Sequence, residues 1–132
     1  MNTKNTNGEL KIVVVDDSDF SRNLIITMLK ETNYQVVGEA NSAESAIQVI
    51  VSKKPNVVIT DVVMPEISGI ELTEKITKNY DGVAVIVISS LSQEHIVLDA
   101  IGAGASDFIP KPIQKQQLID SLDKISSNFK ND

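Results

Sequence analysis

The chain has 132 residues, a formal net charge of −6 and 42% apolar residues, a composition that predicts one soluble domain with its own core. It has no cysteine, which excludes a disulfide framework and a thiolate metal site and fits the reducing cytoplasm. Its acidic charge and scattered basic residues argue against binding to nucleic acid or insertion into a membrane, and its polar N-terminus lacks the apolar core of a signal peptide.

Strand-like and helix-like segments alternate five times, between a disordered tail predicted over residues 1–10 and a C-terminal fray predicted over residues 129–132. We therefore expect one domain over residues 11–128. The expected strands cover residues 11–16, 34–40, 56–61, 83–89 and 106–109. The expected helices cover residues 18–31, the stretch from a cap at Asn41 or Ser42 to Pro55, the stretch from Pro65 to about Lys78, residues 93–103 and residues 113–127.

The apolar residues also predict which faces are buried. Three of the strands, at residues 11–16, 56–61 and 83–89, are apolar on consecutive positions, which is typical of parallel strands covered on both faces. Alternation of such strands with helices predicts a doubly wound α/β sheet with right-handed crossovers and helices on both sides. Helical spacing predicts an inner face of Phe20, Leu24, Ile25, Met28 and Leu29 for the first helix, and of Val97, Ala100 and Ile101 for the fourth, which Gly104 closes.

Polar side chains stand where four of these strands end. Asp16 and Asp17 follow the first strand, Asp61 ends the third, Ser89 ends the fourth and Lys111 follows the fifth. The carboxyl ends of parallel strands share one edge of a sheet, and ligands of open α/β sheets bind there. Three carboxylates, a hydroxyl and an ammonium at that edge suit a hard metal ion and a phosphoryl group.

Each acidic residue has a simpler explanation as well. Asp16 or Asp17 is a favoured helix cap and suits the helix dipole, although one cap needs only one carboxylate. Asp61 also suits the start of the turn before Met64 and Pro65, although this is the less favoured explanation. The alternative for all three is an oxygen-ligand site for Mg²⁺, in which the metal and a lysine offset the mutual repulsion of the carboxylates.

The other candidate residues also have simpler explanations. A lone Lys111 is usually a solvated surface group, but prolines on both sides restrict its backbone, and a cis bond to Pro112 is possible. Ser89 suits a helix cap or a hydrogen bond to a phosphoryl oxygen. Phe108 is most simply a core aromatic, and His95, on an expected exposed helix face, is an ordinary surface residue because partner ligands are not evident.

In this setting the chain resembles a response-regulator receiver domain of the single-domain chemotaxis type over about residues 10–128, and parts of it are similar to the receiver domains of chemotaxis methylesterases. The resemblance implies the flavodoxin-like order 2-1-3-4-5 for the five strands, with five helices. It is carried by Val15-Asp16-Asp17, by the block from Asp61 through Met64-Pro65 to Gly69, by Ser89, and by the block from Gly104 through Phe108 to Lys111-Pro112.

The resemblance also implies roles. Asp61 would be the phosphoacceptor, taking a phosphoryl group from a phosphohistidine of a sensor histidine kinase. Asp17 would bind Mg²⁺ (or Mn²⁺) directly, Asp16 partly through water, and the Val63 carbonyl would be a further ligand. Lys111 would pair with the phosphoryl group. Such a protein catalyses its own phosphorylation and dephosphorylation rather than steady turnover of a substrate.

For the output, the resemblance implies a switch in which Ser89 hydrogen-bonds the phosphoryl group and Phe108 turns inward. The surface of the fourth helix, fifth strand and fifth helix would then bind a downstream protein. The chain departs from common members in Ser89, where Thr is frequent, in the apolar Val63, and in Pro110 before the lysine.

Four other functions are open, and the last three of them fit the residues less well. A receiver that is part of a larger regulator or a phosphorelay intermediate would look the same at the site. An FMN-binding flavodoxin-like module needs a phosphate-cradling first loop, which the carboxylates of Asp16, Asp17 and Asp19 would repel. A haloacid-dehalogenase-type phosphatase needs an Asp-x-Asp pair on the first strand, whereas Asp17-Ser-Asp19 falls at the expected helix. A pure interaction domain leaves unexplained why a polar residue stands at each of the five site positions.

Overall fold

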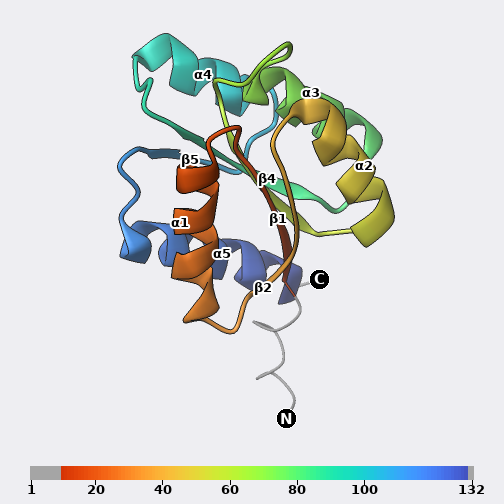
Figure 1. Cartoon of the computed structure of the whole chain (residues 1–132), viewed down its shortest axis with the longest axis vertical. Coiled ribbons are helices and arrows are strands. Elements are labelled where there is room, and N and C mark those ends of the chain that lie inside the picture. Colours follow the sequence, from red (N-terminus) through yellow and green to blue (C-terminus); the bar gives the residue numbers. More distant parts are fainter. Residues whose placement is uncertain (1–9, 131–132) are drawn as a thin grey trace.

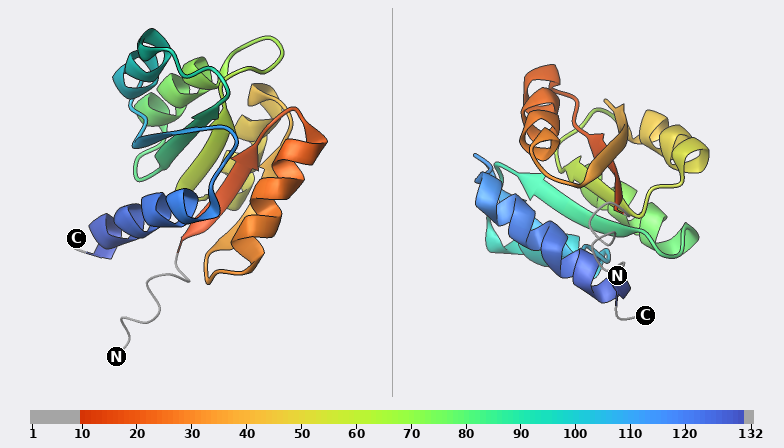
Figure 2. Two further views of the ribbon diagram at one scale, coloured as in Figure 1. Left: turned by 90° about the vertical axis from the view of Figure 1, so that its left-hand side faces the viewer. Right: turned by 90° about the horizontal axis from the view of Figure 1, so that it is seen from below.

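The computed structural model describes residues 10–130 as a parallel sheet with helices on both faces (Figures 1 and 2). The strands are β1 (Lys11–Val15), β2 (Gln35–Ala40), β3 (Val57–Asp61), β4 (Ala84–Ser89) and β5 (Asp107–Pro110). The helices are α1 (Asp19–Lys30), α2 (Ala43–Lys53), α3 (Gly69–Asn79), α4 (Glu94–Gly102) and α5 (Lys115–Lys130). All strand pairs are parallel in the order β2-β1-β3-β4-β5, so the predicted fold and strand order are confirmed.

The sheet divides the core into two clusters because successive side chains of a strand point to opposite faces. In β1, Ile12 and Val14 join the cluster formed with α1 and α5, whereas Val13 and Val15 join the cluster formed with α2, α3 and α4. All four are fully buried. This arrangement explains the consecutive apolar positions and confirms that the central strands are covered on both faces.

Local hydrogen bonds decide where the helices begin and end. The Ser42 hydroxyl accepts from the Ser45 N–H and caps α2, as predicted. Ser68 and Glu71 form a capping box, so α3 begins at Gly69 and not directly after Pro65. Gly104, with φ of 106°, follows the end of α4 in a conformation that suits glycine, as expected for the residue that closes this helix.

The predicted inner faces of α1 and α4 are too wide. Ile25 and Leu29 are buried, but Phe20 is 78% and Leu24 is 41% exposed. Residues advance about 100° each around a helix, so Phe20 and Leu24 lie beside the stripe that contacts the sheet. On α4 the only fully buried residue is Ala100, and Ile101 is exposed.

The structure differs from the prediction at both limits of the domain. Leu10, assigned to the tail, is 1% exposed and belongs to the core cluster of α1 and α5. The last helix continues past Ser127 to Lys130, and Phe129 packs against the same cluster, so residues 129 and 130 are helical rather than frayed. The remaining predicted tail (1–9) and fray (131–132) lie outside the described residues. No helix in residues 10–130 is long and apolar enough to cross a bilayer.

Candidate functional site

The acidic pair lies in the turn between β1 and α1. Asp16 is 1% exposed, and its Oδ1 accepts the Ser18 N–H at 2.9 Å. Ser18, which accepts the Ser21 N–H, is the residue that caps α1. Neither carboxylate is therefore the helix cap that sequence reasoning allowed, and Asp17 stays exposed beside the buried Asp16.

Asp61 joins this pair from the carboxyl end of β3, which lies beside β1 in the sheet. One oxygen atom from each of Asp16, Asp17 and Asp61 lies within 4.8 Å of the others, the only such group of potential metal ligands in residues 10–130. Burial raises the pKa of Asp61, and the Asp16 carboxylate raises it further, against the lowering effect of Lys111. The Val62 N–H donates to Asp61 Oδ1 at 2.8 Å and orients the carboxylate.

Lys111 supplies the cation of the cluster. Its Nζ lies 3.2 Å from Asp16 Oδ2 and 3.3 Å from Asp61 Oδ2, and its side chain is only 22% exposed. The Lys111 N–H donates to the Ser89 carbonyl at 2.9 Å, which fixes the backbone against the end of β4, and the bond to Pro112 is cis. Lys111 is therefore not the solvated surface lysine of the simpler explanation.

The Ser89 hydroxyl is fully buried at the end of β4 and accepts the Leu91 N–H at 2.8 Å. Gln93 stands at the cap position of α4 without a side-chain cap bond, so Ser89 does not cap that helix. A hydroxyl can accept one hydrogen bond and donate another, so Ser89 keeps the capacity to donate its proton to a group at the site. The hydroxyl thus ties the loop before α4 to the end of the strand.

Phe108, in the middle of β5, is half-buried and packs against the core cluster of α2, α3 and α4. Val63, two residues after Asp61, is 56% exposed on the loop before α3. His95 on α4 is exposed, as expected of an ordinary surface residue. Phe108 is therefore neither a fully buried core residue nor a free surface group.

Arg22 is a contributor that sequence reasoning missed. From α1 its guanidinium donates to the Asp16 carbonyl at 2.8 Å, to Glu39 at 2.7 Å and to Asp19 at 2.6 Å, with the side chain 14% exposed. It thus ties the turn that carries the acidic pair to α1 and to β2. The pair Asp19 and Arg22 has a sequence signal, the i, i+3 spacing on a helix, but the contact with Glu39 has none.

Gly69 is the second contributor without an assigned role in the sequence. A Cβ built at this position would lie 1.8 Å from the Asp61 carbonyl oxygen, so no side chain fits. The Gly69 N–H donates to the Val62 carbonyl at 2.7 Å. The start of α3 therefore packs directly on the backbone of the strand that ends in Asp61, and only glycine permits that approach.

The donor set suits a hard divalent cation. Three carboxylates supply only oxygen ligands, the kind that Mg²⁺ takes in proteins, and the cluster lies at the carboxyl edge of the sheet. All of the polar candidates predicted from the sequence come from this edge: the acidic pair after β1, Asp61 on β3, Ser89 on β4 and Lys111 after β5.

Known proteins resemble the chain over most of its length. The model of the response regulator receiver domain matches residues 12–123. Chemotaxis protein CheY of Thermotoga maritima is 35% identical over 116 residues, which span 88% of this chain and 97% of that protein. The response regulator domain of Thermotoga maritima CheB superposes with a TM-score of 0.82 at 31% identity, covering 89% of this chain and 96% of that domain.

A third match shows the fold in a complex. The CheX-CheY-BeF3-Mg²⁺ structure from Borrelia burgdorferi has a TM-score of 0.83 at 24% identity, covering 88% of either chain. Three findings agree with one another. They are the match of the family model, the similarity to Thermotoga maritima CheY over nearly the whole length of that protein, and the order of the strands. The chain belongs to the response regulator receiver domain family.

Proposed function

We propose that this receiver domain is the phosphoacceptor of a two-component, chemotaxis-like signalling system in the cytoplasm. Asp61 would take a phosphoryl group from a phosphohistidine of a sensor histidine kinase. The observation that carries this proposal is the placement of Lys111 Nζ 3.3 Å from Asp61 Oδ2, within a cluster of three carboxylates. A cation held beside the nucleophile is what phosphoryl transfer needs, because such reactions depend on positioning and neutralised charge.

The chemistry is a displacement at phosphorus. A carboxylate oxygen of Asp61 forms the new P–O bond while the P–N bond to the donor imidazole breaks, and the imidazole keeps the electron pair and takes up a proton. Lys111 stabilises charge on the transferred oxygens. In the reset, a water oxygen attacks the phosphorus, the P–O bond to Asp61 breaks, and the carboxylate is regenerated with inorganic phosphate.

The metal ligands would be the carboxylates of Asp16, Asp17 and Asp61 and the Val63 carbonyl. Mg²⁺, or Mn²⁺ in its place, would supply positive charge for the phosphoryl oxygens when bound. Asp16 is held for this role by the Ser18 N–H, and its backbone by Arg22. Burial raises the pKa of Asp61, and a cation bound beside it would favour the charged carboxylate that attacks phosphorus.

The signal would leave the site through Ser89. The Ser89 hydroxyl would donate its proton to a phosphoryl oxygen. Because the same hydroxyl accepts the Leu91 N–H, its movement toward the phosphoryl group would also move the loop before α4. A two-state switch from 1:99 to 99:1 needs about 5.5 kcal/mol of differential interaction. Hydrogen bonds to charged groups contribute about 1.5 to 3 kcal/mol each, so bonds from Ser89 and Lys111 are of the right size.

The output surface would be the face of α4, β5 and α5, with Phe108 turning inward as the loop moves. Two exposed apolar residues on α4, Leu98 (60%) and Ile101 (49%), support a protein partner there. In Borrelia burgdorferi, a structural neighbour forms a complex with CheX, which is consistent with a protein target. A receiver within a longer regulator or a phosphorelay would use the same site chemistry.

The test is intact-mass measurement after incubation with acetyl phosphate, with and without Mg²⁺. Wild-type protein should gain one phosphoryl group only in the presence of metal, and Asp61→Asn should gain none. Asp81→Asn, an exposed carboxylate in a turn, is the matched control and should label like wild type. Full labelling of Asp61→Asn would show that the acceptor is another residue.

A further inference from the structure

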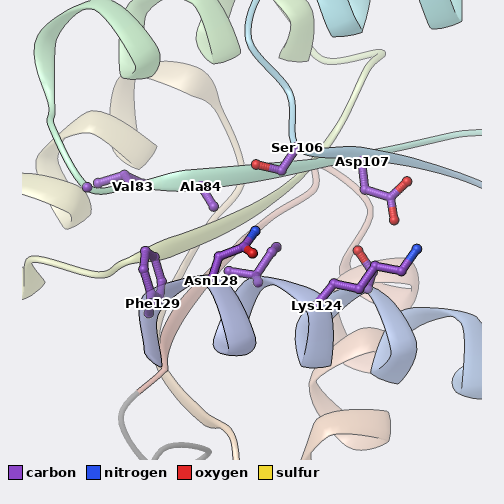
Figure 3. A pocket seen from close by; sticks show the side chains of 10 residues that line it. Val83, Ala84, Ser106, Asp107, Lys124, Asn128 and Phe129 are labelled. Atoms are coloured by element: carbon purple, nitrogen blue, oxygen red, sulfur yellow. The ribbon is translucent and has the colours of Figure 1, made fainter. Parts of the chain in front are cut away.

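The two helices of the proposed output surface are attached to the sheet in different ways. Helix α5 buries three large apolar side chains in the core: Leu118, Leu122 and Ile125. Phe129 packs on the same cluster, and Figure 3 shows it near the end of α5 on the side that faces the beginning of β4. Helix α4 fully buries only Ala100, and residues 90–95 are all exposed. A helix with so little buried apolar surface opens more readily than one with a complete apolar stripe.

The N-terminal end of α4 has no side-chain cap. The three preceding helices are each capped by a serine hydroxyl, from Ser18, Ser42 and Ser68. Gln93 stands at the same position of α4 and makes no such bond, so the first turn is free to fray. Toward the sheet this end is held by the half-buried Ile96 and, two residues before the cap, by the bond from the Leu91 N–H to the Ser89 hydroxyl. The position of this end therefore depends on Ser89.

The C-terminal end of α4 is closed by its own hydrogen bonds. The Gly104 N–H donates to the Ile101 carbonyl at 2.9 Å, and the Ala105 N–H donates to the Ala100 carbonyl at 3.0 Å. With Gly104 at a φ of 106°, these two bonds form the Schellman motif, which satisfies the last carbonyls of a helix. The turn after α4 is therefore a defined structure, unlike the start of the helix.

Thr77, in the last turn of α3, holds this same turn from outside. Its Oγ1 donates to the Ala103 carbonyl at 2.8 Å. A Cβ built on Gly104 would lie 2.7 Å from Thr77 Cγ2, so the threonine side chain approaches the turn as closely as only a glycine permits. At its other end α3 begins with Gly69, which packs on the Asp61 carbonyl. Helix α3 therefore connects the strand of the phosphoacceptor to the C-terminal end of α4.

We infer that α4 pivots about its contact with Thr77, which holds the C-terminal end while the uncapped N-terminal end swings with the loop that Ser89 controls. The drive for this swing rests on the proposed function, since a phosphoryl group would pull Ser89. Leu98 lies about 7 Å along the helix from Ala103, and Ile101 about 3 Å. Displacement grows with distance from a pivot, so a partner that contacts Leu98 would distinguish the two states better than one that contacts Ile101.

Amide hydrogen exchange of the unmodified full-length protein compares the two ends of α4. We expect residues 103–105 to be protected about tenfold or more above Ile96 and Val97, whose N–H groups both donate to the Gln93 carbonyl. Equal protection of the two ends, or stronger protection of the first turn, would overturn the pivot. The comparison needs no phosphoryl group, so its outcome does not depend on whether Asp61 is the acceptor.

Variants of Thr77 test the role of its hydroxyl. Thr77→Val keeps the shape of the side chain and removes the donor, so exchange at residues 103–105 should become about two- to tenfold faster, the range that one hydrogen bond gives. The amides of Leu118 and Leu122 should exchange as in wild type. Thr77→Ser keeps the donor and should restore most of the protection, and Thr27→Val, at an exposed threonine of α1, is the matched control. Wild-type exchange at residues 103–105 in Thr77→Val would overturn the proposal.

Beryllofluoride with Mg²⁺ tests the swing itself. In wild type the amide shifts should be larger at residues 94–97 than at residues 103–105, and in Thr77→Val they should extend to residues 103–105. Wild-type shifts of equal size at both ends would overturn the pivot. If beryllofluoride shifts no amide while the difference in exchange between the two ends is observed, the proposed phosphorylation fails and the pivot stands.

Discussion

The Lys111 ammonium bridges a carboxylate of the turn after β1 and a carboxylate at the end of β3, 3.2 Å from Asp16 Oδ2 and 3.3 Å from Asp61 Oδ2. Its positive charge offsets the mutual repulsion of these two carboxylates. The contact joins the loop after β5 to the ends of β1 and β3. The electrostatics of the site and the stability of the fold therefore depend on the same side chain.

Lys111→Met should lower the free energy of unfolding by about 2 to 4 kcal/mol at neutral pH without metal, since it leaves partly buried carboxylates without their cation. Saturating Mg²⁺ should recover part of this loss. Urea unfolding with and without Mg²⁺ measures both effects. The control is Lys115→Met, which removes an exposed pair with Glu31 and should cost about 0.5 kcal/mol or less. Equal losses in the two variants would contradict the bridging role.

Asp61→Asn should stabilise the metal-free protein at neutral pH. Burial raises the pKa of Asp61, so between its unfolded and folded values the native state binds more protons than the unfolded state. Wild-type stability must therefore fall as the pH rises through that window, and the penalty is complete above the folded pKa. The Asn variant lacks this penalty, so its advantage should vanish as the pH falls below about 4, the usual unfolded value. Urea midpoints across this pH range provide the measurement, and an Asn variant that is less stable at pH 7 would refute the prediction.

Gly69→Ala should destabilise the protein strongly, by about 3 kcal/mol or more, because its Cβ would overlap the Asp61 carbonyl oxygen at 1.8 Å. Gly102→Ala is the matched control: a Cβ there meets nothing within 4 Å, at the end of α4. It should be neutral or stabilising by up to about 1 kcal/mol. Thermal unfolding followed by circular dichroism distinguishes the two, and a tolerated Gly69→Ala would contradict the close approach.

Ser89→Ala should separate phosphorylation from the switch. The variant keeps the acidic cluster and Lys111, so acetyl phosphate should still label Asp61. It loses the acceptor of the Leu91 N–H and the donor to the phosphoryl group, at a cost of about 1 kcal/mol in stability. Beryllofluoride with Mg²⁺ should therefore shift the amides of Leu91 and Phe108 much less than in wild type. Ser90→Ala, an exposed neighbour, should respond like wild type, and a full response in Ser89→Ala would show that the signal bypasses this hydroxyl.

Arg22→Lys should cost about 1 to 3 kcal/mol in the free energy of unfolding although the charge is kept. A single ammonium cannot reach the Asp16 carbonyl, Glu39 and Asp19 together as the guanidinium does. Mg²⁺ affinity, measured by calorimetry, should fall with it because the turn that carries Asp16 loses its support. Lys78→Met, which removes an exposed pair with Glu74, is expected to leave both quantities within error.

The sequence by itself determined the fold class and the carboxylate edge. Runs such as Ile12 to Val15 must be covered on both faces, and parallel strands must end at one edge, so the sequence places Asp16, Asp61 and Lys111 at the same edge of the sheet. The ends of the helices and strands were harder to predict, because a cap such as Ser68 depends on which local hydrogen bond forms.

The tertiary structure decided the contacts that no local pattern encodes. Examples are the exposure of Phe20 and the pairing of Arg22 with Glu39. Both depend on how far each helix lies from the sheet and on how the helix is rotated about its own axis. Spacing along the chain fixes which side chains share a helix face. Only the packing of that face against distant residues fixes which of them are buried, and beside which partner.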